Sequence, residues 1–477
     1  MEYISTRNKF NEVDIYDAII KGLSDDGGLY IPKEFKQVNI MKLIEKSNKE
    51  ILIDILEYFG FLKEDALKAS NVYNNFKSKD FLNIKSFDKF SVIELFHGPT
   101  LAFKDYALTL LPKLLEISLN KKNISKIPLV CAATSGDTGS AALSGFSNIK
   151  KCKTIVFYPS EGISEIQEMQ MKFFEGENAK LYKINGNFDN GQTFLKEMLS
   201  DNKFKNSIKE KYVLTVANSI NIGRIIGQVN YYFVAYKKLV EGKKIIMGEK
   251  IDIRVPTGNF GNILAAYYAK KMGLPIDKLV ACVNKNNVIY DFFNTGEYSI
   301  KRKFYKTIAP AMDILISSNL ERFLYDVYKE DSKINALMKA LKEEERYVCD
   351  LSIISKDISS IYASEDNIKK TIKEIFKNYQ YLVDPHTATG MYKIKKSNSN
   401  HQVIISTASP YKFSDAILSS LEFKVPDLIE DRIKLVSKIS NTDIPNNLVE
   451  IINLKLSKNE KFEIENIYKS ILEFLEV

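Results

Sequence analysis

The chain of 477 residues contains four cysteines and no long apolar run. Cys131, Cys152, Cys282 and Cys349 lie far apart and show none of the paired spacings of a zinc site. We therefore expect reduced, mostly buried thiols in a reducing compartment. No stretch is apolar over the length that a membrane-spanning helix needs, and the first twenty residues lack the apolar core of a secretory signal. These absences predict a cytoplasmic protein without a membrane partner.

Histidine is also scarce, because the chain contains only His97, His386 and His401. Three histidines argue against a multi-histidine metal centre, and we expect no bound metal. The formal net charge of +8 arises from 68 basic and 60 acidic side chains. Random signs on that many charges give an imbalance of about this size, so the charge predicts no nucleic-acid partner.

The order of predicted elements indicates an α/β fold of two or three lobes. From about residue 91, short β-branched runs alternate with amphipathic helical stretches, as in parallel sheets covered by helices. We predict an N-terminal helical domain over 1–90, a catalytic α/β region over 91–425 with a helical insertion around 301–381, and a C-terminal lobe over 426–477. The predicted strands are 91–96, 127–134, 153–159, 179–184, 251–256, 278–284 and 401–407, and the clearest helices are 105–119, 137–146, 222–239 and 261–273.

Two predicted loops join a strand to a helix, where open parallel sheets bind ligands. In VPTGNFG (255–261), Gly258 and Gly261 allow the backbone to approach a phosphate, although a plain turn explains them equally well. In ATSGDTGSAAL (133–143), hydroxyl side chains and exposed amides suit an anion such as a carboxylate. Asp137 in this loop is alternatively an N-cap of the following helix.

A third segment, NSINIGRIIGQVNYYF (218–233), places Arg224 one turn after a helix start. The helix dipole disfavours a cation there, so the arginine is either held for an anion from outside the chain or engaged in a surface salt bridge. A fourth, ELFHGPTLAFKDYAL (94–108), places Lys104 among apolar neighbours. Desolvation lowers the pKa of a lysine, and pyridoxal phosphate needs such a lysine for an imine, together with a phosphate cradle and a partner for its ring nitrogen.

These four segments, in this order, closely resemble the bacterial and fungal form of threonine synthase. That family consists of pyridoxal-phosphate enzymes of the tryptophan-synthase-β type, fold type II, with parallel sheets in two lobes and helical extensions. The segments DDGGLYIP (25–32), APAMDI (309–314), DPHTATG (384–390) and STASPYKF (406–413) resemble the same family. The resemblance therefore covers most of the chain.

The resemblance implies a role for individual residues. Lys104 is the Schiff-base lysine and the catalytic residue, and Thr407 is the expected contact of the pyridine nitrogen, with Ser406 and Ser409 as competitors. The cofactor phosphate is expected at Gly258, Asn259, Phe260, Gly261 and Asn262. The substrate is expected to contact Thr134, Ser135, Asp137 and Thr138 through its carboxylate, and Ser219, Asn221 and Arg224 through its phosphate.

Four further residues lie in these segments, and a structural role is the more common one for each of them. His97 and His386 are either substrate ligands or, more often in proteins, imidazoles bonded to the backbone. Phe103 is expected to pack rather than to stack on the cofactor, and Asp105 to cap the helix that begins near it.

The reaction that the resemblance implies is the last step of threonine biosynthesis, in which O-phospho-L-homoserine and water give L-threonine and phosphate. Another lyase of the same fold, such as a serine or threonine dehydratase or a sulfhydrylase, would share Lys104 and the glycine loop. A non-catalytic relative would bind ligand without turnover. The resemblance leaves open whether the protein is a monomer or a homodimer.

Overall fold

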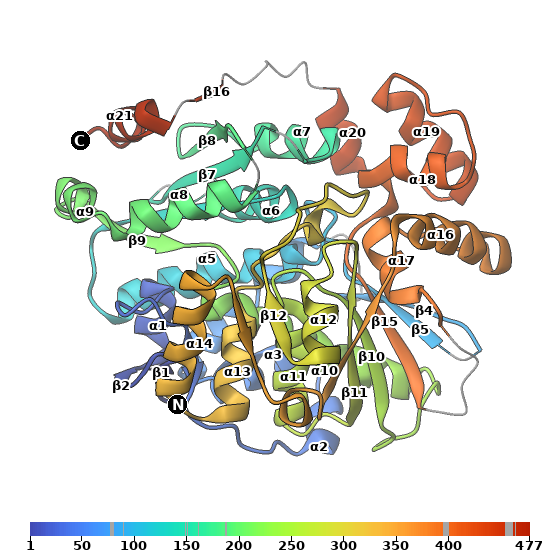
Figure 1. Cartoon of the computed structure of the whole chain (residues 1–477), viewed down its shortest axis with the longest axis horizontal. Helices are drawn as coiled ribbons and strands as arrows, with labels where there is room; N and C mark the ends of the chain where they lie inside the picture. The colour runs from blue at the N-terminus through green and yellow to red at the C-terminus, as the bar shows by residue number, and fades with distance from the viewer. Residues whose placement is uncertain are drawn as a thin grey trace.

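Two parallel β-sheets, each covered by helices, form the body of the molecule in the computed structural model (Figure 1). The structure describes residues 1–76, 81–88, 90–147, 149, 151–160, 162–186, 188–394, 400–453, 461–462 and 464–477. Among these residues, no helix is long and apolar enough to cross a membrane. The α/β class predicted from the alternation of strands and helices is therefore correct.

The larger sheet has six strands in the order β14-β11-β10-β15-β5-β4, and every neighbouring pair is parallel except β4 and β5. Four of its strands were predicted within two residues. Their neighbour β14 lies inside the segment expected to be a helical insertion, so that segment also contributes a sheet edge. The strands are β4 (Asn83–Ser86), β5 (Phe90–Glu94), β10 (Ile251–Pro256), β11 (Ile276–Val283), β14 (Ile358–Tyr362) and β15 (His401–Ser406).

The smaller sheet has five parallel strands in the order β16-β8-β7-β6-β9. Side chains alternate across it, because Val130 and Ala132 of β6 face one core while Leu129 and Cys131 face another. Both faces are apolar, as expected for a parallel sheet that is covered on both sides. The strands are β6 (Ile127–Ala133), β7 (Lys153–Pro159), β8 (Ala179–Ile184), β9 (Tyr212–Val216) and β16 (Lys461–Phe462).

Helices from the central region separate and cover the two sheets. Helix α10 packs between α5 and α11, and it is buried on nearly all sides rather than on the single face that its apolar spacing predicted. Arg224 of α10 is therefore an interior residue. The helices of this region are α5 (Lys104–Lys121), α6 (Asp137–Phe146), α7 (Glu165–Phe173), α8 (Phe188–Ser200), α9 (Asn202–Ile208), α10 (Ile222–Glu241) and α11 (Gly261–Lys271).

The N-terminal segment is less helical than predicted. It contains a three-stranded antiparallel sheet in the order β2-β1-β3. These strands were not predicted, because β1 and β3 have only three residues each and β2 is mostly exposed and polar. Its elements are β1 (Tyr3–Ser5), β2 (Asn8–Val13), α1 (Ile15–Lys21), β3 (Tyr30–Pro32), α2 (Ile40–Ile44), α3 (Asn48–Tyr58), α4 (Lys63–Ala69) and the 3-10 helix η1 (Val72–Asn75).

The chain beyond β11 adds strands to both sheets and many helices around them. It contains α12 (Val288–Thr295), β12 (Glu297–Ser299), η2 (Pro310–Met312), α13 (Leu320–Tyr328), α14 (Asp331–Glu343), β13 (Arg346–Val348), α15 (Leu351–Ile354), α16 (Glu365–Tyr379), α17 (Pro385–Met391), η3 (Pro410–Phe413), α18 (Ser414–Ser420), α19 (Ile429–Ser440), α20 (Asn446–Ile452) and α21 (Ile464–Leu475). Helix α21 packs Ile467, Ile471 and Leu475 into a core that it shares with strands of the smaller sheet. The end of the chain therefore lies beside that sheet (Figure 1).

Buried Arg322 of α13 connects the N-terminal domain to the loop after β9. Its guanidinium donates to the carbonyl oxygens of Tyr30 (2.8 Å) and Ile220 (2.5 Å), and to Oδ1 of Asn319 (2.6 Å). The neighbouring Glu321 accepts hydrogen bonds from Thr6 and Arg7, which strengthens the same junction. A buried cation that satisfies several carbonyl groups is costly to remove, because those carbonyls then lose their donors.

We predict that Arg322→Leu lowers the free energy of unfolding by about 3 kcal/mol, because buried acceptors lose their donors. Urea unfolding followed by circular dichroism measures this change. The matched control is Arg346→Leu, which removes an exposed guanidinium 3.6 Å from Glu297. Equal stability of the two variants would contradict the role of Arg322 as a connector.

Candidate active site

A cavity lies where the carboxyl ends of strands from both sheets approach each other. Its walls come from the loops after β6, β9 and β10, from the end of β15, and from the starts of α5, α10 and α17. Loops that follow parallel strands are the usual ligand sites of such sheets. The cavity is lined by Phe103, Lys104, Ala133, Ser135, Asp137, Thr138, Asn218, Ser219, Arg224, Gln228, 256–263, Ala311, Met312, His386 and Thr407.

Lys104 is the first residue of α5, and its amine faces this cavity. The residue is 9% exposed, and burial lowers the pKa of its amine to about 8. Asp137 opposes this shift, whereas the positive charges of Arg224 and Lys412 add to it. The amine therefore has an appreciable neutral fraction near neutral pH, which a nucleophile or base requires.

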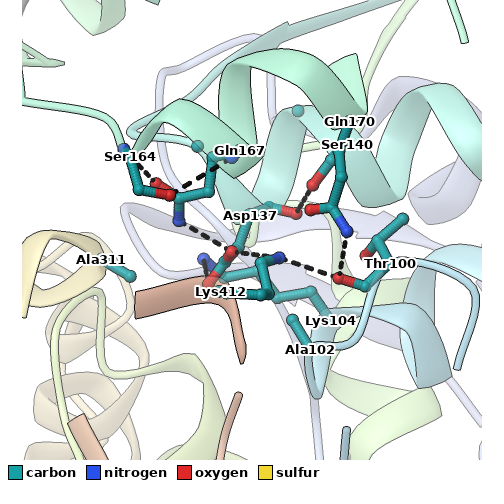
Figure 2. A network of polar contacts seen from close by, with 12 residues as sticks. Thr100, Ala102, Lys104, Asp137, Ser140, Ser164, Gln167, Gln170, Ala311 and Lys412 are labelled. Atoms are coloured by element: carbon teal, nitrogen blue, oxygen red, sulfur yellow. Dashed lines mark hydrogen bonds and ion pairs between the residues drawn. The ribbon is translucent and has the colours of Figure 1, made fainter. Parts of the chain in front are cut away.

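Asp137 opens α6 and lies between two lysines (Figure 2). Its Oδ1 accepts hydrogen bonds from Lys412 Nζ (2.7 Å) and from Gln167 Nε2 (2.8 Å), while Oδ2 lies 3.9 Å from Lys104 Nζ. Burial acts to raise the pKa of this carboxyl, but Lys412 and Lys104 outweigh burial and hold the pKa below its usual range. Gly136 takes the N-cap position, so the alternative that Asp137 is an N-cap is wrong.

Gly136 allows the turn that places Asp137. Its φ of +131° is unfavourable for other residues, and a Cβ there would lie 2.5 Å from the side chain of Gln167. Gln167 is in turn held by a capping box with Ser164 at the start of α7. The position of the carboxylate thus depends on the packing of α7 against α6.

The loop from Gly258 to Asn262 leads into α11 and presents its backbone to the cavity. Phe260 has a left-handed conformation (φ 62°), which its buried ring stabilises by stacking on Phe293. A Cβ on Gly258 would lie 3.1 Å from the carbonyl oxygen of Ala311, so this position favours glycine. Buried Nδ2 of Asn262 has no hydrogen-bond partner in the described part of the chain.

These features fit the phosphate of pyridoxal phosphate. Free amides at the start of α11 and an unpartnered buried Asn262 amide are suitable donors for an anion. Lys104 and the hydroxyl residue Thr407 line the same cavity. The donor set therefore matches the three requirements of this cofactor: an amine, a phosphate cradle and a polar contact for the ring nitrogen.

Among the three hydroxyl residues predicted near the ring nitrogen, Thr407 lines the cavity. Ser406 Oγ lies 3.0 Å from Thr387 Oγ1, and Ser409 precedes η3, with its amide bonded to the carbonyl of Leu101. Thr407 thus remains our candidate for this contact.

Arg224 is 2% exposed and lies in the cavity wall rather than at the surface. One of its terminal nitrogens donates to the carbonyl of Ala217 (2.7 Å), while its buried Nε has no partner among the described residues. Burial lowers the pKa of the guanidinium to about 10, so it stays charged at neutral pH. The surface salt bridge considered as an alternative is therefore wrong.

Ser135, Thr138 and Ser219 line the cavity as predicted, but two other predicted substrate ligands do not. Thr134 Oγ1 accepts hydrogen bonds from the amides of Gly136 and Gly139, which holds the loop before α6. Asn221 caps α10 and donates to the carbonyls of Ile19 and Val216. Both side chains shape the site through backbone contacts.

Both histidines in question are bonded within the protein. His386 lines the cavity, accepts a hydrogen bond from the amide of Ala311 at Nε2 (3.1 Å), and lies 2.7 Å from Asp384 through Nδ1. These contacts favour a proton on Nδ1. His97 lies 2.9 Å from Glu94 and outside the cavity lining.

Asp105 is not the helix cap that the sequence suggested, because α5 begins at Lys104. Its carboxylate accepts hydrogen bonds from the amide and the hydroxyl of Thr100 (2.8 and 2.6 Å). It thereby fixes the turn that carries Lys104.

No sequence prediction of the site included Lys412, Asn218, or the part of the cavity wall that Ala311 and Met312 form. All of them lie in or beside segments that resemble the family, but no local pattern distinguished them. Asn218 bonds to the backbone of Ala133 in both directions and so ties the ends of β6 and β9 together.

Comparisons with known proteins agree with this geometry. A family model described as pyridoxal-phosphate dependent enzyme matches residues 93–406, and one described as threonine synthase N terminus matches residues 2–71. Threonine synthase of Saccharomyces cerevisiae is 36% identical over 88% of this chain and 89% of its own length. The family, fold class and cofactor predicted from the sequence are confirmed.

Two solved structures of threonine synthases are also similar to this chain over nearly its whole length. The crystal structure of yeast threonine synthase aligns with this chain with a TM-score of 0.86 and 33% sequence identity. The alignment covers 100% of this chain and 99% of the yeast chain. The pyridoxal-phosphate-bound threonine synthase from Brucella melitensis has a TM-score of 0.83 and 31% identity, with 99% of both chains covered.

We predict that Asn221→Ala lowers the free energy of unfolding by about 2 kcal/mol, because α10 loses its cap and two buried carbonyls lose a donor. Thermal and urea unfolding measure the effect. Since the side chain lies outside the cavity lining, the folded variant should bind substrate with an affinity within about threefold of the wild type. A wild-type stability with strongly weakened substrate binding would instead restore Asn221 as a ligand.

Proposed function

Because this chain belongs to the threonine synthase family of pyridoxal-phosphate-dependent enzymes, we propose that it converts O-phospho-L-homoserine and water into L-threonine and phosphate. One observation supports this substrate above others. The cavity that contains Lys104 also contains the buried guanidinium of Arg224, which has no carboxylate partner in the described part of the chain. A buried cation without a partner favours a ligand that supplies the anion.

We assign the cofactor contacts from the donor groups of the cavity. Lys104 would hold pyridoxal phosphate covalently, the amides of 258–262 and the Asn262 side chain would bind its phosphate, and Thr407 would face its ring nitrogen. When bound, the cofactor serves as an electron sink for a substrate carbanion. A neutral hydroxyl at the ring nitrogen, in place of a carboxylate, would leave that nitrogen largely unprotonated.

Lys104 is the proposed acid and base. With a pKa near 8, about a tenth of the free amine is neutral at pH 7, and the rest is an ammonium ion. The amine can thus accept a proton from the substrate and return it to another carbon, provided that both carbons lie within its reach. Its low exposure excludes bulk water from this exchange.

The two anionic groups of the substrate would bind to different loops of the cavity. Ser135, Thr138 and the amides at the start of α6 suit the carboxylate, while Ser219 and Arg224 suit the phosphate. Asp137 is a poor ligand for either anion, because it carries the same sign of charge. We therefore assign it to Lys104, which its Oδ2 faces.

We extend the proposal to the partners of the protein. The protein would act on small molecules as a monomer or homodimer, without nucleic acid. A cytoplasmic location agrees with four cysteines that are all free and buried.

We predict that Lys104→Ala abolishes both the covalent attachment of the cofactor and threonine formation. The wild type should release phosphate and threonine in equal amounts from O-phospho-L-homoserine and should be much less active on unphosphorylated serine, threonine or homoserine. Coupled phosphate assay, amino-acid analysis and the visible spectrum of the bound cofactor measure these quantities. The control is Lys122→Ala, at the far end of α5.

Turnover by Lys104→Ala would contradict the assignment of the lysine. A wild type that binds the cofactor and prefers an unphosphorylated amino acid would favour a dehydratase or sulfhydrylase. A wild type that binds the phosphorylated substrate without turnover would favour a ligand-binding relative.

We predict that Arg224→Gln raises the KM for O-phospho-L-homoserine by about 10- to 100-fold, because a charge-assisted contact with phosphate is lost. Cofactor content should remain at the wild-type level, since Arg224 is assigned to the substrate side. Steady-state kinetics and the ratio of cofactor to protein measure the two effects. Loss of cofactor with an unchanged KM would place this guanidinium on the cofactor instead.

A further inference from the structure

We propose that Lys412 is a positioning residue, which pairs with Oδ1 of Asp137 so that the second oxygen of this carboxylate faces Lys104 without trapping its amine as an ion pair. This inference rests on the proposed role of Lys104 as acid and base. Lys412 lies outside the cavity lining, holds Asp137 by an ion pair, and also acts on Lys104 directly through its positive charge.

The two oxygens of Asp137 have different partners (Figure 2). Oδ1 has two strong donors, the ammonium group of Lys412 and the side-chain amide of Gln167. Oδ2 lies 3.9 Å from Lys104 Nζ, which is within ion-pair range but too long for a hydrogen bond. The carboxylate is therefore bound firmly on the side away from the catalytic amine and weakly on the side toward it.

Lys412 is buried and has a second hydrogen-bond acceptor besides Asp137. It is 1% exposed, and its Nζ also donates to the carbonyl oxygen of Thr100 (2.8 Å). Thr100 in turn bonds to Asp105, next to Lys104 at the start of α5. Lys412 thus connects η3 to both chain segments that carry the reacting charges, the start of α6 and the turn before α5.

The charges of Asp137 and Lys412 affect the protonation state of Lys104. An unpaired Asp137 close to Lys104 would favour the ammonium form of Lys104, which cannot act as a base. The positive charge of Lys412 offsets that effect, and it also compensates the buried carboxylate. Without Asp137, two buried lysines and Arg224 would repel one another and favour the neutral amine.

Other titratable groups face this cluster from the elements packed around it. Arg224 on α10 contributes a positive charge toward Lys104, and His386 on α17 acts on Asp137. Asp105 on α5 lies close enough to interact with Lys412. Variants that replace Asp137 or Lys412 keep these other groups. Differences in the pKa of Lys104 among such variants therefore report on the pair formed by Asp137 and Lys412.

The proposal predicts shifts of opposite sign in the pKa of Lys104. Lys412→Met should raise this pKa by about one pH unit or more, because Asp137 loses its compensating charge and Lys104 loses a neighbouring positive charge. Asp137→Asn should lower it by a similar amount, because the charge of Lys412 is then unopposed. The double variant Asp137→Asn/Lys412→Met should return toward the wild-type value.

The measurement uses full-length protein freed of cofactor. Acetic anhydride acetylates neutral amines, and mass spectrometry of the Lys104 peptide gives the extent of labelling at each pH relative to the denatured chain. Circular dichroism checks the fold of every variant. Lys122→Met is the control, because Lys122 also pairs with two carboxylates, those of the partly exposed Asp14 and Asp17, at the other end of α5.

Opposite shifts with partial reversal in the double variant would support the proposal. Shifts of the same sign, or a pKa of Lys104 that stays within the range of the Lys122→Met control, would overturn it. If Lys412→Met fails to fold, Asp137→Asn and the double variant still decide the question, because the proposal requires a higher pKa in the double variant. Neither cofactor nor substrate takes part, so an inactive protein in the phosphate assay would leave this result unaffected.

Discussion

The contact between Lys104 and Asp137 requires two opposite charges to remain inside the protein, and much of the surrounding structure serves this requirement. Isolated charges are expensive to bury, and a buried pair is stable only when its remaining hydrogen bonds are satisfied. Lys412 and Gln167 satisfy Asp137 on one side, while the turn fixed by Thr100 and Asp105 holds Lys104 on the other. The amine is thereby desolvated yet still able to change its protonation state.

The same construction explains why the cavity attracts anions. The starts of α6 and α11 line it, and Arg224 adds a full positive charge that the described chain does not neutralise. Because these groups are buried, they bind anions more strongly than they would at the surface. The proposed substrate, with its carboxylate and phosphate, and the cofactor phosphate would together supply one anion for each of these three groups.

Much of the framework could be predicted from local patterns. The strands that become β7, β8 and β10 and the helix that becomes α6 were predicted with their observed bounds, because parallel strands between glycine-containing turns give strong apolar signals. Strand β9 and the short N-terminal strands were missed, since brief or half-buried strands lack a clear period. Strand β14 was missed for another reason: a mostly helical, charged segment obscured five residues that only the neighbouring β11 makes into a sheet edge.

Sequence by itself determined the fold class and the family, and it singled out Lys104, the glycine loop and the loop that begins α6 as candidates, because each of these three is a contiguous segment whose residue types are tied to its conformation. Tertiary structure decided how single side chains are used. It turned Asn221 and Thr134 toward the backbone, placed Arg224 in the interior, and brought Lys412 from η3 to Asp137 across 275 positions of sequence. Such choices depend on which groups share a buried space, and electrostatic interactions there act through distance and burial rather than through order along the chain.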